Sequence, residues 1–291
     1  MTVQAGNGVA ASRRTTRSRR STSSLWIGCA VLLFWIAVAL FGPSVAPYGQ
    51  GDILSAQSFA FPPEAAFLGT DYLGRDVLTR LLYGARMTLG IALLASLLTF
   101  GCGVTLGFLA ATVGGWLDQG LSRLVDALLS FPSLVLALIV ISGFGTSLPV
   151  VIATVALTEA VRVFRVSRAL ALEVLVKDFV DGARARGEGP LWIMFREILP
   201  NVTGPLLGEF GLRYVYVILT VSALSFLGLG MQPPAADWGV MVKENIQGLY
   251  AGSAAVLAPA AAIATVTISI NLIVDWFLAR SDNRIPAEMH R

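Results

Sequence analysis

The sequence carries little charge for its length. Of its 291 residues, 13% are Asp, Glu, Lys or Arg, whereas 55% are hydrophobic and the mean hydropathy is +0.73. A soluble domain carries about 25% charged residues. This shortage excludes an ordinary soluble globular protein and predicts an all-α membrane protein that crosses the bilayer several times.

Residues that carry chemistry are also scarce. The single histidine, His290, stands at the second-last position, so histidine metal sites and Ser–His catalysis have almost nothing to build on. The two cysteines, Cys29 and Cys102, lie inside apolar runs, which argues against a disulfide framework. The only lysines, Lys177 and Lys243, do not follow the G-x-x-x-x-G pattern of a phosphate-binding loop. We therefore expect no enzyme activity, no ATP hydrolysis, and no cofactor or metal in this chain.

Apolar runs, in contrast, are abundant and long enough to cross a bilayer, which takes about 20 residues. Six spans are expected, at Leu25–Gly42, Met87–Val113, Leu124–Phe144, Ser147–Val166, Gly204–Leu229 and Ser253–Leu278. Pro132 and Pro259 lie inside the third and sixth spans, where a proline can kink the helix.

The first span follows a basic leader, residues 1–24, which is expected to be disordered and cytoplasmic. A cleaved signal peptide is the alternative for this region, with Ser44-Val45-Ala46 as its cleavage site. The apolar run is long for a signal peptide, which favours a transmembrane helix.

The placement of basic residues predicts the orientation, because cytoplasmic loops carry the excess of Lys and Arg. With both termini in the cytoplasm, 16 of the 21 basic residues fall on that side, 4 fall on the other, and Arg213 lies within a span. Residues 25–43 then form the first transmembrane helix, 44–86 an external segment, 87–280 a core of five spans, and 281–291 a cytoplasmic tail. Arginines scattered between apolar spans do not suggest nucleic-acid binding.

The external segment ends in an amphipathic stretch, Arg75–Leu82. Its apolar residues share one helical face, so a short helix here would lie at the lipid surface or cap the bundle. A second external segment, Gly230–Tyr250, contains Trp238, which is expected to be an interfacial anchor.

One charged segment, Lys177–Asn201, interrupts the apolar pattern between the fourth and fifth spans. Ala183 and Gly187 lie four residues apart on one helical face, and their small side chains would let another surface approach the backbone. Glycines then break this helix, Leu191–Leu199 resumes an amphipathic pattern, and Pro200 opens the next span. The pattern predicts a cytoplasmic helix–turn–helix, although an ordinary solvated loop has the same composition.

Five charged residues fall within or beside the predicted spans. Asp126, Glu159 and Asp275 lie near the predicted cytoplasmic ends, where interfacial or capping roles are expected rather than a translocation role. Glu209 and Arg213 are four residues apart, a spacing that predicts an intrahelical ion pair rather than a substrate site.

The charged segment resembles the signature loop of ABC-importer permeases, E-A-A-x3-G-x9-I-x-L-P. The corresponding positions are Asp181-Gly182-Ala183, Gly187 and Glu197-Ile198-Leu199-Pro200. Asp181, Gly182 and Glu197 depart from the pattern, whereas the spacing from Ala183 to Pro200 is kept.

Other stretches resemble the permeases of dipeptide, oligopeptide and nickel importers. They are Leu68–Asp76 followed by Tyr83–Arg86, Gly114–Asp118 through Phe131-Pro132, and Ala223–Gly230 with Pro233-Pro234 and Trp238-Gly239. The resemblance covers about Leu25 to Pro286 and is closest to the second, C-type permease. The family's C-terminal pattern is degraded here to Val274-Asp275 and Ser281-Asp282-Asn283.

This resemblance implies a type I importer permease fold in the bacterial inner membrane. It implies a heterodimer with a second permease, two cytoplasmic ATPases that bind ATP and Mg²⁺, and an external substrate-binding protein that delivers peptide. The ATPases would dock on a coupling segment, residues 168–201. The coupling residues carried over from the signature are Asp181, Gly182, Ala183, Arg184, Gly187, Leu199 and Pro200.

Several alternatives stay open. A nickel or glutathione importer permease would share these motifs. A stand-alone secondary transporter should show inverted repeats, which the sequence lacks. A membrane-embedded hydrolase would need a nucleophile–base pair or a metal cluster within the spans, and neither is evident.

Overall fold

The computed structural model describes residues 22–61, 67–232 and 234–281, so the basic leader up to residue 21 and the tail from residue 282 lie outside the described residues. The described part is helical and contains no strand, only two isolated β-bridges. The α-helices are α1 (Thr22–Val45), α2 (Val77–Val113), α3 (Gly115–Leu129), α4 (Ser133–Phe144), α5 (Leu148–Leu175), α6 (Asp178–Ala185), α7 (Pro190–Trp192), α8 (Leu199–Phe226), α9 (Trp238–Glu244) and α10 (Ala254–Ser281). A π-helical turn, η1 (Ile193–Ile198), joins α7 to α8, and a 3₁₀ turn, η2 (Ile246–Leu249), follows α9.

Four continuous helices in the described residues are long and apolar enough to cross a membrane: Ser23–Val45, Val77–Val113, Pro190–Phe226 and Ala254–Arg280. The pair α3 and α4 would make a fifth span if counted together. The predicted fourth span corresponds to α5. This helix is 28 residues long, but it is not among the apolar helices because charged residues recur along it. Length and composition therefore support four or five of the six predicted spans.

The structure corrects the boundary predicted before the second span. Arg75–Leu82 does not start a separate amphipathic helix, because α2 begins at Val77 and continues without a break to Val113. The carboxylate of Asp76 caps this helix by accepting a hydrogen bond from the backbone N–H of Thr79 at 2.8 Å. With no proline after the cap, nothing separates the predicted surface helix from the span.

The predicted third span is broken rather than kinked. α3 begins at Gly115, nine residues before the predicted start at Leu124, and α4 leaves it at an angle of 92°. Pro132 sits between them with an extended backbone, φ −57° and ψ 127°. Proline has no N–H to donate, and it disfavours helical geometry in the residue before it. The chain therefore ends one helix at Leu129 and starts another at Ser133.

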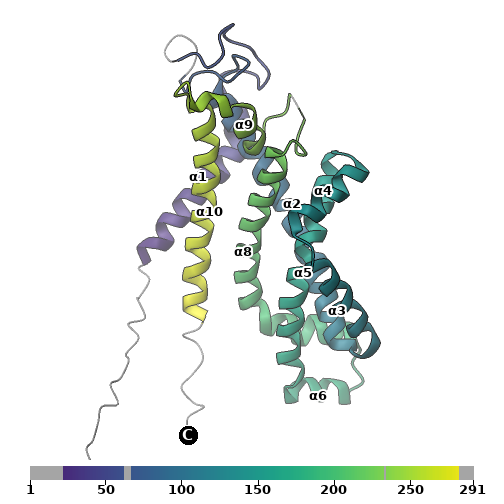
Figure 1. The fold of residues 1–291 in the computed structure, drawn as a ribbon. Helices are drawn as coiled ribbons and strands as arrows, with labels where there is room; N and C mark the ends of the chain where they lie inside the picture. Colours follow the sequence, from purple (N-terminus) through teal and green to yellow (C-terminus); the bar gives the residue numbers. More distant parts are fainter. Residues whose placement is uncertain (1–21, 62–66, 233, 282–291) are drawn as a thin grey trace, which may run out of the picture.

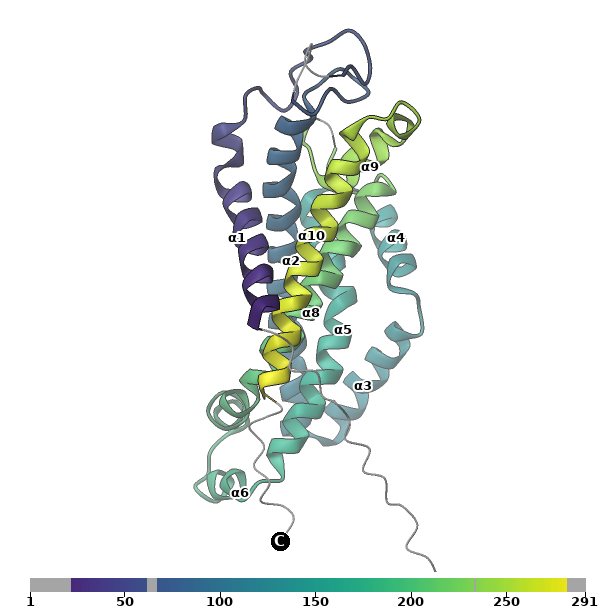
Figure 2. The ribbon, with the colours of Figure 1, turned by 90° about the vertical axis from the view of Figure 1, so that its left-hand side faces the viewer.

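Figures 1 and 2 show the helices as an elongated bundle with two distinct ends. α1 and α10 lie side by side, α2 and α8 run through the middle, and α5 with α3 and α4 forms the far edge. The first residues of α1 and the last of α10 lie at the same end as α6. We call this the α6 end. The segment before α2 lies with α9 at the opposite end, which we call the α9 end.

Small residues bring the central helices into close contact. A Cβ added to Gly103 or Gly107 on α2 would lie 2.7 Å from the nearest atom of α5. On α8, a Cβ at Gly208 or Gly211 would collide with side chains of α10. Close backbone approach of this kind is how helices pack in a membrane, where burial of apolar surface from water provides no driving force between them.

Buried ion pairs hold the α9 end together. Arg75 Nε contacts Asp71 Oδ2 at 2.7 Å, and Glu244 Oε2 contacts Arg75 Nη2 at 3.0 Å and Arg80 Nη2 at 3.2 Å. These residues connect the segment before α2, the first turn of α2 and the last residue of α9. Together with Trp238, which is fully buried rather than an interfacial anchor, they form an ion-pair cap over the bundle.

Candidate functional site

The coupling segment predicted from the signature lies at the α6 end, between α5 and α8 (Figure 1). α6 is amphipathic. Val180 and Ala183 on its inner face are fully buried, and Val180 belongs to one apolar cluster with Ile193, Met194 and other side chains from α2, α5 and η1. Its outer face carries Asp181 and Arg184, which are exposed and paired with each other at 3.2 Å, while Gly182 is half-buried. The structure therefore packs the apolar face of α6 on this cluster and leaves its polar face outward. We call the cluster the apolar seat of α6.

Gly187 ends this helix, as the sequence predicted. Its φ is +83°, a left-handed conformation that favours glycine. The N–H of Gly187 donates to the carbonyl of Arg184 at 2.9 Å, and the N–H of Glu188 donates to the carbonyl of Ala183 at 3.2 Å. This pair of bonds is a Schellman motif, which satisfies the last carbonyls of the helix and turns the chain sharply.

The second helix of the predicted hairpin does not stay separate. α7, η1 and α8 form one continuous helix from Pro190 to Phe226, so the hairpin runs directly into the following span. Pro200 has no N–H for the carbonyl of Arg196, and the turn before it widens to π spacing, with Leu199 N donating to Met194 O. Leu199 packs partly buried against the same apolar seat, and Pro200 is exposed.

The sequence prediction did not single out the apolar residues that this region exposes. Val176, Phe179, Leu191 and Phe195 are large, hydrophobic and exposed around the coupling segment. Beside them lies a groove of about 460 Å³, lined among others by Glu173, Lys177, Asn201 and Pro205. The sequence does hold a signal for these side chains, because they are apolar residues that lie outside every predicted span.

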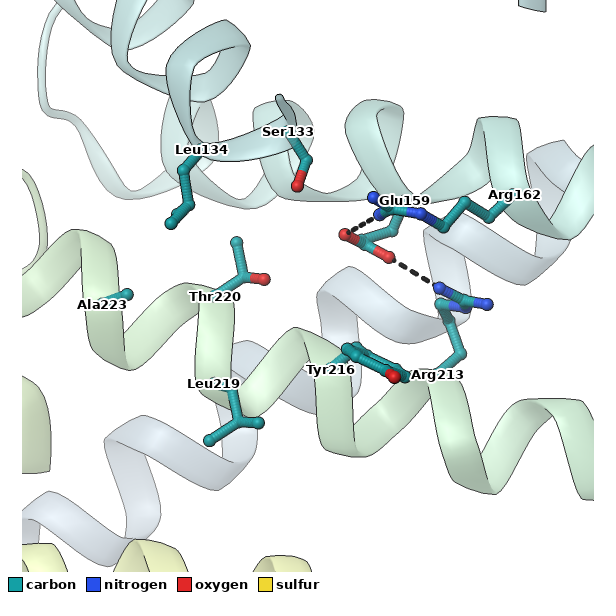
Figure 3. A pocket seen from close by; sticks show the side chains of 9 residues that line it. All are labelled: Ser133, Leu134, Glu159, Arg162, Arg213, Tyr216, Leu219, Thr220 and Ala223. Atoms are coloured by element: carbon teal, nitrogen blue, oxygen red, sulfur yellow. Dashed lines mark hydrogen bonds and ion pairs between the residues drawn. The ribbon is translucent and has the colours of Figure 1, made fainter. Parts of the chain in front are cut away.

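A second candidate site lies between α4, α5 and α8 and contains charged residues from two helices (Figure 3). Glu159 on α5 is 2% exposed. Its Oε1 accepts a hydrogen bond from Arg162 Nη1 at 2.8 Å, and its Oε2 accepts one from Arg213 Nη1 at 2.9 Å. Arg213 also donates to Glu209 Oε1 at 2.5 Å. Four side chains thus form a chain of alternating charge across the space between two helices.

The pocket beside these charges has a volume of about 510 Å³. Arg162, Arg213 and Glu159 line its polar part together with the hydroxyl-bearing side chains of Ser133 and Thr220. The remaining lining is mainly apolar and consists of Leu134, Tyr216, Leu219 and Ala223. The guanidinium of Arg213 lies 5.3 Å from the ring centroid of Tyr216, within the range of a cation–π contact.

The predicted roles of the intramembrane charges are partly confirmed. Glu209 and Arg213 form the predicted pair, but Arg213 also binds Glu159. The prediction for Glu159 was wrong, because α5 continues to Leu175 and places this residue in its middle rather than at an end. Asp126 is exposed and pairs with Arg165, as an interfacial residue would. The sequence signal that was missed is the pair of Glu159 with Arg162, an acid and a base three residues apart on α5.

Burial also perturbs a carboxyl at the α9 end. Asp237 caps α9 by accepting a hydrogen bond from the N–H of Val240 at 3.0 Å. Burial raises the pKa of the Asp237 carboxyl above its usual value, and the backbone hydrogen bonds oppose this change only in part. Within the described residues, no three His, Cys, Asp or Glu side chains lie together as a metal site would require.

Comparison with known proteins identifies the family. Residues 103–286 match the model of the family described as "Binding-protein-dependent transport system inner membrane component". The chain belongs to this family. It is therefore an inner-membrane component of such a transport system, in agreement with its several apolar helices.

Relatives match over most of the chain. It is 31% identical to the dipeptide transport system permease protein DppC of Alkalihalophilus pseudofirmus, over 86% of this chain and 82% of that protein. It is 35% identical to the di/tripeptide transport system permease protein DppC of Pseudomonas aeruginosa, over 85% and 84%. It is 32% identical to the glutathione transport system permease protein GsiD of Pectobacterium atrosepticum, over 84% and 81%.

Proposed function

We propose that this chain is the C-type permease subunit of an ATP-driven importer that takes up di- and oligopeptides through a binding protein. The observation that carries the proposal is the seat of α6: two fully buried residues, Val180 and Ala183, hold a helix whose polar face points out of the bundle. The similarity to permeases named for dipeptide and di/tripeptide transport supports peptides as the substrate.

In this proposal the chain crosses the membrane six times, with α5 as one of the crossings and both termini in the cytoplasm. The charges of α5 support a crossing in contact with protein rather than lipid, because intramembrane charges face a bundle interior or a water-filled cavity. Glu159 is buried and paired, as this requires. The α6 end is then cytoplasmic and the α9 end external, which agrees with the excess of basic residues that the sequence has in the segments assigned to the cytoplasm.

The proposed mechanism needs partners on both sides. A second, similar permease completes the passage, an external protein delivers peptide to the α9 end, and two cytoplasmic ATPases bind ATP and Mg²⁺. The coupling residues are Asp181, Gly182, Ala183, Arg184, Gly187, Leu199 and Pro200. The ATPases contact the exposed ones, Asp181, Arg184, Gly187 and Pro200, whereas the buried Ala183 and the partly buried Leu199 hold the segment on the bundle. Shifting a two-state equilibrium from 1:99 to 99:1 takes about 5.5 kcal/mol of differential affinity. That free energy reaches this chain through α6 and the turn at Gly187.

The test compares two aspartate substitutions in the complete importer. Gly187→Asp places a bulky anion on the turn, and we expect loss of ATPase co-purification and of peptide uptake with normal membrane insertion. Gly252→Asp is the matched control, because Gly252 has the same left-handed backbone and open surroundings but lies between η2 and the start of α10, away from the coupling segment. Normal uptake by Gly187→Asp, or equal loss in both variants, would contradict the coupling role.

A glutathione importer is the second candidate, favoured by the similarity to a permease named for glutathione transport. The two substrates separate in a competition assay with the complete importer. An excess of glutathione should leave uptake of a labelled tripeptide nearly unchanged if peptides are the substrate, and should suppress it if glutathione is.

A further inference from the structure

The pocket between α4, α5 and α8 has an electrical polarity that points to one chemical class of ligand. Its charged side chains follow the order Glu209, Arg213, Glu159, Arg162, each bonded to the next. Glu209, the negative end, is absent from the pocket lining, whereas Arg162, the positive end, is part of it. The four charges sum to zero, yet the end of the chain that a ligand meets is a cation.

Arg162 is the accessible member of this chain. Its side chain is 40% exposed, compared with 10% for Arg213 and 2% for Glu159. Both oxygens of Glu159 already accept hydrogen bonds from the two arginines. Because Glu159 is also buried, a cationic ligand meets little accessible carboxylate, whereas an anionic ligand meets an exposed guanidinium.

The donors of Arg162 suit a carboxylate. A guanidinium has five N–H donors in a planar fork, and the structure records one of them, on Nη1, as bonded to Glu159. Planar forks of this kind bind carboxylates through two parallel hydrogen bonds. The side chains of Ser133 and Thr220 in the same lining can add hydroxyl donors.

The remaining space suits the rest of a small peptide. A volume of about 510 Å³ lies within the range of small-molecule sites, roughly 300–1,000 Å³. Leu134, Leu219 and Ala223 offer apolar surface that does not discriminate between side chains. A site with one fixed polar group and an apolar lining of low selectivity recognises a chemical group that all peptides share.

We propose that Arg162, held in place by Glu159, binds the carboxylate of the imported substrate during its passage through this chain. This inference rests on the proposed function. The shared chemistry is a carboxylate, which a peptide presents at its C-terminus or on an acidic side chain.

The test measures uptake into proteoliposomes that contain the complete importer, its binding protein and ATP on the ATPase side. Three probes are compared: trialanine, trialanine with a C-terminal amide, and Ala-Glu-Ala amide, whose only carboxylate is on its side chain. The variants are Arg162→Gln, Arg162→Lys and the control Arg165→Gln, which removes an exposed cation one turn away that pairs with Asp126. The readout is the ratio of uptake rates for acid and amide within each preparation. Dividing the ratio of a variant by the wild-type ratio cancels the selectivity of the binding protein, which is the same in both.

We expect the acid-to-amide ratio to fall about tenfold in Arg162→Gln, to recover in part in Arg162→Lys, and to stay at the wild-type value in Arg165→Gln. A parallel fall for Ala-Glu-Ala amide would assign the site to any carboxylate, and a fall for trialanine alone would assign it to the C-terminus. An unchanged ratio in Arg162→Gln, or an equal fall in Arg165→Gln, would overturn the assignment. Wild-type importer that takes up none of the three probes would instead refute the proposed function itself.

Discussion

Arg213 on α8 donates a hydrogen bond to Glu159 on α5 across 2.9 Å, although 54 positions separate them in the chain. The pair joins two helices at the level of the pocket, and Arg213 is shared with Glu209 on its own helix. Removing one partner from a buried ion pair leaves an uncompensated charge, which is far more damaging than losing an exposed pair.

Replacing Arg213 with methionine should therefore destabilise the chain by about 3 kcal/mol, because Glu209 loses its recorded cation while Glu159 keeps Arg162. Arg165→Met, which removes an exposed pair with Asp126, should change stability by less than about 1 kcal/mol. Thermal unfolding of the two variants in detergent measures the difference. Equal melting temperatures would show that Arg213 is not needed to neutralise the buried carboxylates.

The left-handed turn after α6 predicts which residues can replace Gly187 with the least loss of activity. Gly187 has a φ of +83° with open space around it, so the obstacle to a side chain is conformational rather than steric. Asparagine enters the left-handed region more readily than alanine. Gly187→Asn should thus keep more ATP-driven uptake than Gly187→Ala, whose strain is about 1 kcal/mol. If alanine is tolerated as well as asparagine, the left-handed turn is not what the coupling segment needs.

The seat of α6 can be tested without touching its polar face. Ala183 is fully buried, whereas Ala185 on the same helix is exposed. Ala183→Leu overpacks the seat, and we expect a penalty of about 1–3 kcal/mol that lifts α6 and exposes the coupling segment to protease. Ala185→Leu adds the same atoms into solvent and should leave the cleavage rate unchanged. Equal protection of both variants would contradict the seating of α6.

The buried cap of α9 predicts a pH dependence. Burial raises the folded-state pKa of Asp237, so this group favours folding at low pH, and that contribution is lost as pH rises through the folded pKa. Asp237→Asn keeps a capping oxygen without the charge. Its melting temperature relative to wild type should rise as pH increases from about 4 and then level off above the folded pKa.

Asp237→Ala separates the cap from the charge. It removes the acceptor for the N–H of Val240 and should cost about 1 kcal/mol relative to Asp237→Asn at every pH. A pH profile of Asp237→Asn that parallels wild type would show that Asp237 does not titrate in this range.

Features that depend on residues close together in the sequence were predicted correctly. The turn at Gly187 and the pair of Glu209 with Arg213 depend on residues three or four positions apart, and both are present as predicted. A predicted kink at Pro132 became a full break, because the sequence shows that a helix is weakened there but not which neighbours would hold it together.

Contacts between distant segments could not be predicted in the same way. Glu159 was placed near a helix end because the apolar run fades near Val166, whereas α5 continues to Leu175, with Arg165 and Arg168 paired to α3. Arg162 was counted only as a basic residue on the cytoplasmic side. Its position in a pocket depends on α4 and α8, which the spacing of charges within one helix does not reveal.

α2 has a consequence for how the two faces of the membrane communicate. Its first turn is clamped in the ion-pair cap, and Phe108, 31 residues later, belongs to the cluster that seats α6. At about 1.5 Å per residue, these 37 residues form a strut of roughly 55 Å with no joint along its length. Under the proposed function, docking of the delivery protein outside and the nucleotide state inside would tilt the same strut. Each event should then alter the affinity of the other by an equal factor.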